Sequence, residues 1–152
     1  MSSTNEMKIE FDSRSCNEGF ARVAVASFLT QLDPTLEEVS DVKTAVSEAV
    51  TNCIIHGYDN EVHKINIECR IINNEIEIVI IDTGKGIENI EQALEPLFTT
   101  KPELERSGMG FAFMEAFMDK VEVISKVGQG TSVYMKRVIG NIIPQDVDRK
   151  EE

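Results

Sequence analysis

Residues 76–87 read IEIVIIDTGKGI, and this stretch decides how the rest of the chain is interpreted. The apolar run from Ile76 to Ile81 predicts a buried strand, which places Asp82 where the chain leaves a sheet. A carboxylate at that point can accept one directed hydrogen bond. Gly84 and Gly86 let a flat ligand approach closely, because neither carries a Cβ. These residues indicate one side of a nucleotide site.

A second glycine pair supplies a complementary signal. Gly108 and Gly110 open a predicted helix, whose first backbone N–H groups can hold phosphate. The stretch after the strand is not a P-loop, because Gly86 follows Lys85 where that motif needs Ser or Thr. A Gly-x-Gly-x-x-Gly dinucleotide fingerprint is also missing from the sequence. The nucleotide site therefore belongs to another class.

A patterned segment over residues 34–56 predicts a long helix, with Asp33 as its N-cap and Pro34 at the first helical position. Glu48 and Asn52 lie one turn apart on this helix and share a face. That face is opposite the apolar stripe, so a solvated surface explains the pair as well as a cleft does. In a cleft, Glu48 could take a proton from a hydroxyl, and the Asn52 amide oxygen could ligate Mg²⁺.

The remaining periodicity predicts one domain that combines a sheet with helices. Alternating apolar residues predict strands near 7–11, 65–71, 76–81, 121–127 and 131–138. Helical spacing predicts further helices over 17–31 and 110–119, the first burying Phe20, Val23, Ala24 and Ser27. The order predicts a two-layer α/β (α+β) sandwich, in which helices cover one face of a mixed, mostly antiparallel sheet.

The segments outside this pattern have separate interpretations. Residues 88–107 are irregular and long for a loop in a compact domain, which is typical of a functional lid. Residues 1–6 are expected to be frayed, and residues 139–152 form a charged tail that is expected to be disordered. The domain proper is therefore expected to span 7–138.

The composition limits the classes of function. The chain has 152 residues and a formal net charge of −12, which disfavours nucleic acid as a partner and favours a basic protein. Because the sequence has neither a signal peptide nor a long apolar run, we expect a cytoplasmic protein without a membrane partner. Cys16, Cys53 and Cys69 lack the spacing of a metal site or a disulfide framework.

Three segments resemble the N, G1 and G2 boxes of the GHKL superfamily of ATPases and kinases: SEAVTN at 47–52, DTGKG at 82–86 and SGMGF at 107–111. Within that superfamily, residues 7–138 resemble the anti-sigma factor serine kinases of endospore-forming bacteria. The stretch PLFTTKPELERSGMG at 96–110 carries this resemblance most specifically. It implies a Bergerat-type ATP-binding fold with a mobile ATP lid.

The resemblance also implies an activity and its partners. A homodimer would bind and inhibit a sporulation sigma factor, and it would phosphorylate a serine on an anti-anti-sigma protein with Mg-ATP. Asp82 would accept a hydrogen bond from the adenine amino group, with Thr131 near the same pocket, and Asn52 would hold Mg²⁺. The remaining nucleotide contacts would come from Gly84, Gly86, Thr99, Thr100, Lys101, Gly108 and Gly110.

Three further roles follow from the same resemblance. Glu48 would be the general base, and Arg106 would stabilise charge on the transferring phosphoryl group. Arg22 would lie in the surface that binds the protein partners. Without the resemblance, Arg22 could equally be a solvated surface charge.

Two alternatives remain open from the sequence. The triplet Asp82-Thr83-Gly84 after an apolar run also resembles the active-site motif of aspartic proteases, which would require a chain made almost entirely of strands. A non-catalytic protein could instead hold nucleotide as a structural ligand and sequester a partner in a nucleotide-dependent way. The effect of replacing Glu48 on phosphate transfer would distinguish that protein from a kinase.

Overall fold

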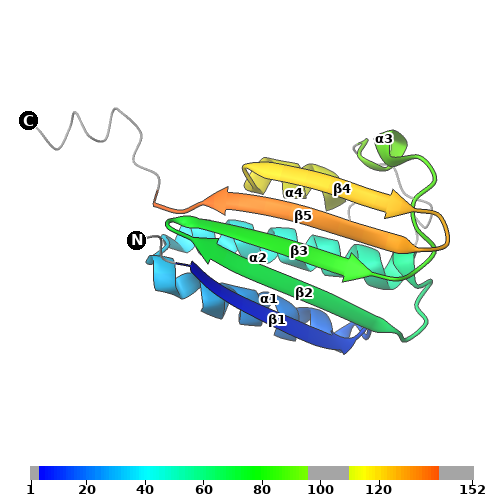
Figure 1. Cartoon of the computed structure of the whole chain (residues 1–152), viewed down its shortest axis with the longest axis horizontal. Coiled ribbons are helices and arrows are strands. Elements are labelled where there is room, and N and C mark those ends of the chain that lie inside the picture. Colours follow the sequence, from blue (N-terminus) through cyan, green and yellow to red (C-terminus); the bar gives the residue numbers. More distant parts are fainter. Residues whose placement is uncertain (1–3, 96–109, 141–152) are drawn as a thin grey trace, which may run out of the picture.

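A five-stranded sheet forms one layer of the molecule. The computed structural model describes residues 4–95 and 110–140. The strands are β1 (Thr4–Asp12), β2 (Lys64–Ile72), β3 (Glu75–Asp82), β4 (Lys120–Lys126) and β5 (Gly130–Val138), and they lie in the order β1-β2-β3-β5-β4 (Figure 1). All four pairs of neighbouring strands in this sheet are antiparallel.

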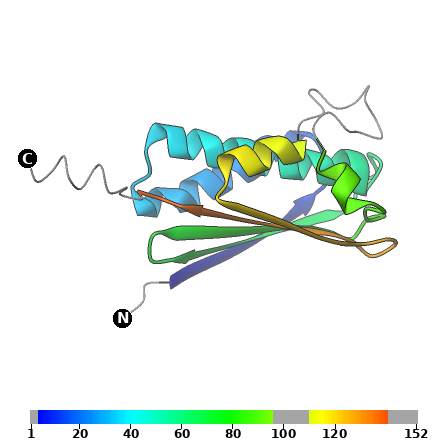
Figure 2. The same cartoon turned by 90° about the horizontal axis from the view of Figure 1, so that it is seen from above.

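The helices form the second layer and cover one face of the sheet (Figure 2). The long central helix α2 (Leu36–Asn52) packs between α1 (Cys16–Leu29) and α4 (Gly110–Phe117). A 3-10 turn (Thr30–Leu32) follows α1, a single π turn (Cys53–Gly57) extends α2, and the short helix α3 (Ile90–Ala93) follows β3. The predicted two-layer sandwich with helices on one face is confirmed.

The core lies between the two layers. Each strand directs alternate side chains towards the helices, because successive residues of a strand point to opposite faces. The helices α1 and α2 complete the core with aliphatic residues at helical spacing. The fully buried core side chains include Val25, Leu29, Val42, Val46, Ile65, Ile67, Ile76, Ile78, Ile80, Met114, Met135 and Ile139.

The β2–β3 hairpin sets the register that places Asp82. Ile72 pairs with Glu75, so the turn consists of Asn73 and Asn74. Asn73 adopts a left-handed conformation with φ of 55°, which Asn tolerates better than most residues. The strand β3 is eight residues long and ends at Asp82, opposite Ile65 on one side and Thr131 on the other.

Three sequence predictions about the ends and faces of these elements are wrong. The cap of α2 is Thr35 and not Asp33, because Thr35 and Glu38 form a reciprocal capping box. Asp33 instead adopts a left-handed conformation after the 3-10 turn. Residues 4–6 are not frayed, because they pair with residues 70–72 of β2.

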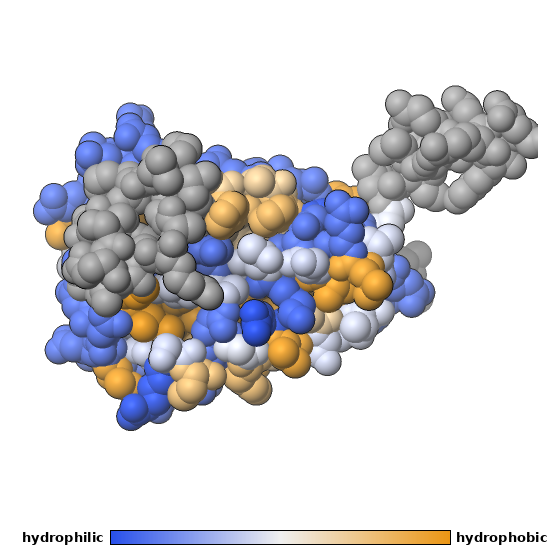
Figure 3. Space-filling view, turned by 180° about the vertical axis from the view of Figure 1, so that it is seen from behind, coloured by the Kyte–Doolittle hydropathy of each residue, from blue (hydrophilic) through white to orange (hydrophobic). Residues whose placement is uncertain are grey.

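The third error concerns α1. The helix buries Ala21, Val25 and Leu29, whereas Phe20 and Val23 are 55% and 56% exposed. Its apolar residues occupy more than one face, so periodicity did not select the buried one. The helical side of the molecule shows apolar patches among polar side chains (Figure 3). The tail predicted over 139–152 begins too early, because Ile139 is buried in the core. The predicted lid from 96 onwards and the tail from 141 onwards lie outside the described residues.

Candidate functional site

A cavity of about 400 Å³ lies where the end of α2, the end of β3, the β5 strand and the start of α4 meet. Five of the predicted site residues line it: Asn52, Asp82, Gly86, Gly110 and Thr131. The sequence separates these residues by up to about eighty positions, and the fold gathers them because α2 crosses behind the sheet. The cavity is therefore the candidate nucleotide site.

Asp82 lines this cavity and is 5% exposed. Its Oδ1 accepts a hydrogen bond from the Gly84 backbone N–H at 2.9 Å. Burial raises the pKa of this carboxyl above its ordinary value, while the N–H groups of Gly84 and Thr131 and the Cys53 thiol oppose the rise. Asp82 is thus a buried, oriented acceptor, which suits recognition of one ligand donor.

The turn after Asp82 is packed directly onto the end of α2. A Cβ on Gly84 would lie 2.0 Å from the carbonyl oxygen of Gly57, so only glycine fits at residue 84. The Lys85 N–H donates to the same carbonyl at 3.0 Å. Gly86 has φ of +80° and lies against the Lys126 carbonyl, where a side chain would be strained. Gly86 therefore lines the cavity, whereas Gly84 lets the turn pack against the end of the helical segment.

Thr131 is buried, and its hydroxyl lies 2.7 Å from the Ser125 hydroxyl. Ser125 also accepts a hydrogen bond from the Ile87 N–H at 2.8 Å and lies 3.2 Å from the Gly130 carbonyl oxygen. This serine joins β4 to the segment that leaves the cavity after Gly86. Sequence reasoning missed Ser125, because its pairing with Thr131 depends on the β4–β5 register.

Glu48 and Asn52 lie together beside the first residue of α4. A Cβ on Gly110 would lie 3.1 Å from Asn52 Nδ2, 3.3 Å from Asn52 Oδ1 and 3.4 Å from Glu48 Oε2. Neither side chain is fully exposed. The pair therefore faces the start of α4 and is only partly exposed to solvent, and its role in the site stays a prediction.

The oxygen atoms at this side of the cavity suit Mg²⁺. Residues 4–95 and 110–140 hold no group of three or more His, Cys, Asp or Glu side chains that could bind a metal ion. Mg²⁺ commonly takes only one or two protein oxygens and completes its shell with substrate phosphates and water. The Asn52 amide oxygen, next to Glu48, matches that pattern.

The other predicted site residues lie elsewhere. Thr99, Thr100, Lys101, Arg106 and Gly108 fall outside the described residues. Arg22 is exposed on α1 and does not line the cavity. Its guanidinium lies 4.0 Å from the carboxylate of Glu18, which in turn accepts a hydrogen bond from the Ser47 hydroxyl.

Comparison with known proteins assigns the family. Residues 13–137 match the histidine kinase-like ATPase domain. The chain is 64% identical to the anti-sigma F factor of Oceanobacillus iheyensis over 134 residues, which is 88% of this chain and 92% of that protein. The chain belongs to the anti-sigma F factor family. This result confirms the resemblance carried by the three boxes.

Other anti-sigma F factors match over nearly their whole length. The Clostridium beijerinckii protein is 62% identical, with 89% of this chain and 95% of that protein covered. The protein of a Thermoanaerobacter species is 58% identical, with coverage of 93% and 99%. Together with the helical layer of the fold, family membership excludes the aspartic protease alternative.

A solved structure supports the fold independently. The crystal structure of the RsbU and RsbW domains of a Mycobacterium tuberculosis protein superimposes with a TM-score of 0.64. The match covers 89% of this chain and 32% of that chain at 18% identity, so the fold is conserved far beyond the sequence similarity. None of the helices among the described residues is both long enough and apolar enough to span a bilayer.

Proposed function

We propose that the protein is an ATP-dependent anti-sigma factor that also acts as a serine kinase. It binds and inhibits a sporulation sigma factor, and it phosphorylates a serine on an anti-anti-sigma protein. One observation carries the proposal. A buried carboxylate, Asp82, and the Asn52 amide line a single cavity, and Glu48 lies beside Asn52 at the start of α4, in a chain of the anti-sigma F factor family.

We propose that the adenine base of ATP binds beside Asp82. Asp82 accepts a hydrogen bond from the adenine amino group, and Thr131 contacts the same base. Gly86 contacts the nucleotide from the lining of the cavity, and Gly84 holds the turn beside it against the Gly57 carbonyl. GTP binds more weakly, because guanine presents an acceptor where adenine presents a donor.

We propose that phosphoryl transfer takes place beside Asn52 and Glu48. Asn52 would hold Mg²⁺ through its amide oxygen, and the bound cation would neutralise charge on the phosphates. Glu48 takes the proton from the attacking serine hydroxyl. Arg106 stabilises the charge that develops on the migrating phosphoryl group. Phosphate contacts come from Gly108, Gly110, Thr99, Thr100 and Lys101.

The partner surface is proposed on α1. Arg22, Phe20 and Val23 are exposed there, and exposed arginine and aromatic side chains are typical of interface hot spots. Arg22 is connected through Glu18 and Ser47 to the turn of α2 that carries Glu48. The net charge of −12 suits a basic, DNA-binding sigma factor. The resemblance to the anti-sigma factor serine kinases supports two further parts of the proposal, that the protein is a homodimer and that it acts in the cytoplasm.

The nucleotide selects the partner in this proposal. ATP and ADP can shift partner choice only by the difference in their own affinities for the two complexes. Sigma factor from the native host should therefore bind more tightly in the presence of Mg-ATP than of Mg-ADP. Because truncation of an arginine hot spot costs about 2 kcal/mol or more, Arg22→Ala should weaken binding at least about 30-fold.

The experiment measures sigma-factor affinity in the presence of each nucleotide, for wild type, for Arg22→Ala and for Arg70→Ala. Arg70 is an exposed arginine on the sheet and serves as a charge-matched control. Transfer of labelled phosphate from ATP to the anti-anti-sigma protein is measured in parallel. The proposal would be refuted if sigma-factor affinity were the same with ATP and ADP, were unchanged by Arg22→Ala as it is by Arg70→Ala, and no phosphate were transferred. Nucleotide-dependent binding without transfer would favour the non-catalytic protein.

A further inference from the structure

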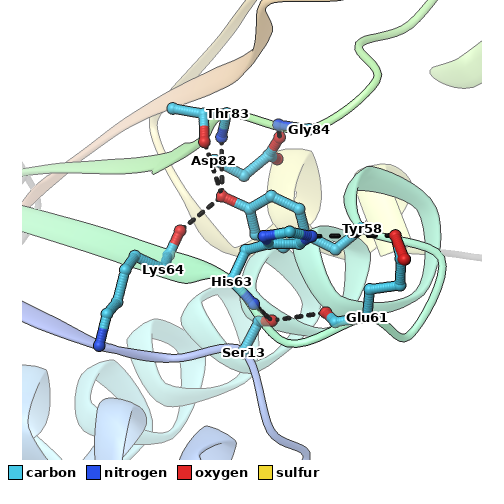
Figure 4. A network of polar contacts seen from close by, with 8 residues as sticks. All are labelled: Ser13, Tyr58, Glu61, His63, Lys64, Asp82, Thr83 and Gly84. Atoms are coloured by element: carbon cyan, nitrogen blue, oxygen red, sulfur yellow. Dashed lines mark hydrogen bonds and ion pairs between the residues drawn. The ribbon is translucent and has the colours of Figure 1, made fainter.

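Tyr58 lies immediately behind the nucleotide-site turn and is 5% exposed. Its hydroxyl accepts a hydrogen bond from the Thr83 backbone N–H at 2.8 Å and donates one to the Lys64 carbonyl at 2.5 Å. The Thr83 hydroxyl lies 3.3 Å away. Figure 4 shows the tyrosine reaching from the end of α2 to both strands. One phenol group thus joins the residue after Asp82 to the first residue of β2.

The loop that follows Tyr58 is bound to the junction between β1 and α1. The ring of His63 lies 4.9 Å from the Tyr58 ring, centroid to centroid. The His63 N–H donates to the Ser13 hydroxyl at 2.9 Å, and the Ser13 N–H donates to the His63 carbonyl at 2.8 Å. Ser13 in turn donates to the Glu61 carbonyl at 2.9 Å and is 2% exposed (Figure 4).

A second contact reinforces the same junction. The Lys64 ammonium lies 2.7 Å from the Asp12 carboxylate, and the Asn17 side chain donates to the Asp12 carbonyl at 2.9 Å. Asn17 is in the first turn of α1, the helix that carries Arg22. An unbroken series of contacts therefore runs from Thr83 through Tyr58, His63 and Ser13 to the start of α1.

We propose that Tyr58 is a positioning residue that couples the nucleotide site to α1. The proposal rests on the proposed function, because it describes how that site communicates with the partner surface. The hydroxyl can accept from Thr83 and donate to Lys64 only when the turn and the start of β2 hold one relative position. A ligand that fixes Asp82 and its turn also fixes this position, and the Ser13 contacts transmit it to α1.

Hydrogen–deuterium exchange with Mg-ATP alone tests the coupling without a protein partner. In wild type, saturating Mg-ATP should slow exchange in peptides covering residues 82–87 and also in peptides covering 12–17. Tyr58→Phe keeps the ring and removes the hydroxyl. In this variant, Mg-ATP at saturation should still slow exchange in 82–87, whereas the slowing in 12–17 should be lost.

Nucleotide affinity provides a second measurement. It uses two different single variants, so the coupling can still be tested if one of them folds poorly. Tyr58→Phe and Ser13→Ala should each weaken Mg-ATP binding by roughly 2- to 12-fold, the range expected for one net hydrogen bond. The double variant should bind no more weakly than the weaker single variant, because both substitutions interrupt one series of contacts. Ser13 does not line the cavity, so a purely local effect would leave its variant unchanged.

Tyr134→Phe is the matched control. Its hydroxyl donates to Glu77 at 2.6 Å from the same sheet, outside this series of contacts, and its removal should leave both measurements at wild-type values. An ATP response in residues 12–17 that survives Tyr58→Phe, or additive effects of the two single variants on affinity, would overturn the coupling. Failure of wild type to bind Mg-ATP would refute the proposed function itself, and the coupling with it.

Discussion

Gly57 lies directly against the carboxylate of Asp82. A Cβ on residue 57 would lie 2.9 Å from Asp82 Oδ2 and 3.0 Å from Oδ1. The π turn that ends α2 therefore places bare backbone beside the buried acceptor, and this close approach fixes the direction in which the carboxylate points. Gly57 thus lines the cavity as well as ending the helical segment.

Gly57→Ala should weaken ATP binding because the new methyl group displaces the Asp82 carboxylate. Displacement that breaks one charge-assisted hydrogen bond to the ligand costs about 1.5–3 kcal/mol, or roughly 10- to 150-fold in affinity. Calorimetry with Mg-ATP measures the effect. Gly19→Ala is the control, since nothing lies within 4 Å of a Cβ there, and it should bind ATP like wild type. Equal affinities for all three proteins would show that Gly57 only ends the helix.

Asp82→Asn should weaken ATP binding to a similar extent, roughly 10- to 150-fold. The amide can direct a donor at the adenine amino group, so an attraction becomes a clash of donors. The variant should also lose discrimination against GTP. Calorimetric titrations with both nucleotides measure the two effects. ATP affinity equal to that of wild type would refute the assignment of Asp82.

Glu77 gives a pH-dependent contribution to folding. Its carboxylate accepts from the Tyr134 hydroxyl and pairs with Arg70, and these partners lower its pKa below the ordinary value of 4.5 despite partial burial. A lowered pKa stabilises the fold above the unfolded-state pKa, and this stability disappears as the pH falls through the folded-state pKa.

Glu77→Gln should therefore reduce the free energy of unfolding by about 1 kcal/mol at neutral pH. The difference from wild type should shrink towards zero at an acidic pH below the folded-state pKa, where both side chains are neutral. Urea denaturation of the nucleotide-free proteins at the two pH values measures this. A difference that stays constant with pH would mean that ionisation of Glu77 contributes nothing.

The three thiols should differ in reactivity. Cys16 is exposed, whereas Cys53 and Cys69 are buried. Burial raises the pKa of Cys69 to about 12 and that of Cys53 well above its ordinary value, and only the thiolate is a good nucleophile. A disulfide reagent should label one thiol rapidly in the native protein and all three after denaturation. Rapid native labelling of Cys53 would contradict its burial beside Asp82.

Much of the fold was predictable because its signals are local. Alternation in residues 65–82 fixed the hairpin, and the spacing of apolar residues fixed the buried face of α2. The cap of α2 was also available from sequence, since Thr35 and Glu38 have the spacing of a capping box. In α1, apolar residues on several faces left the choice to tertiary packing, and Phe20 was placed wrongly.

Some residues of the site were likewise predictable from local sequence, and others were not. Asp82, Gly84 and Gly86 are adjacent in sequence, and a strand end beside two glycines was enough to indicate them. Ser125, Tyr58 and the role of Gly57 depend on contacts between residues that are 6 to 38 positions apart. Such contacts follow from strand register and from the π turn, neither of which has a local sequence signature. They became visible only in three dimensions.

The rate of phosphate transfer by Glu48→Gln shows whether Glu48 is the general base of a serine kinase. The substitution keeps the shape of the side chain and removes its ability to take a proton. With labelled ATP and the anti-anti-sigma protein of the native host, transfer should fall by about 10²- to 10⁴-fold, while Mg-ATP binding survives. Glu122→Gln, an exposed carboxylate on β4, should transfer phosphate at the wild-type rate. Wild-type transfer by Glu48→Gln would contradict the account, because the general base would then lie elsewhere.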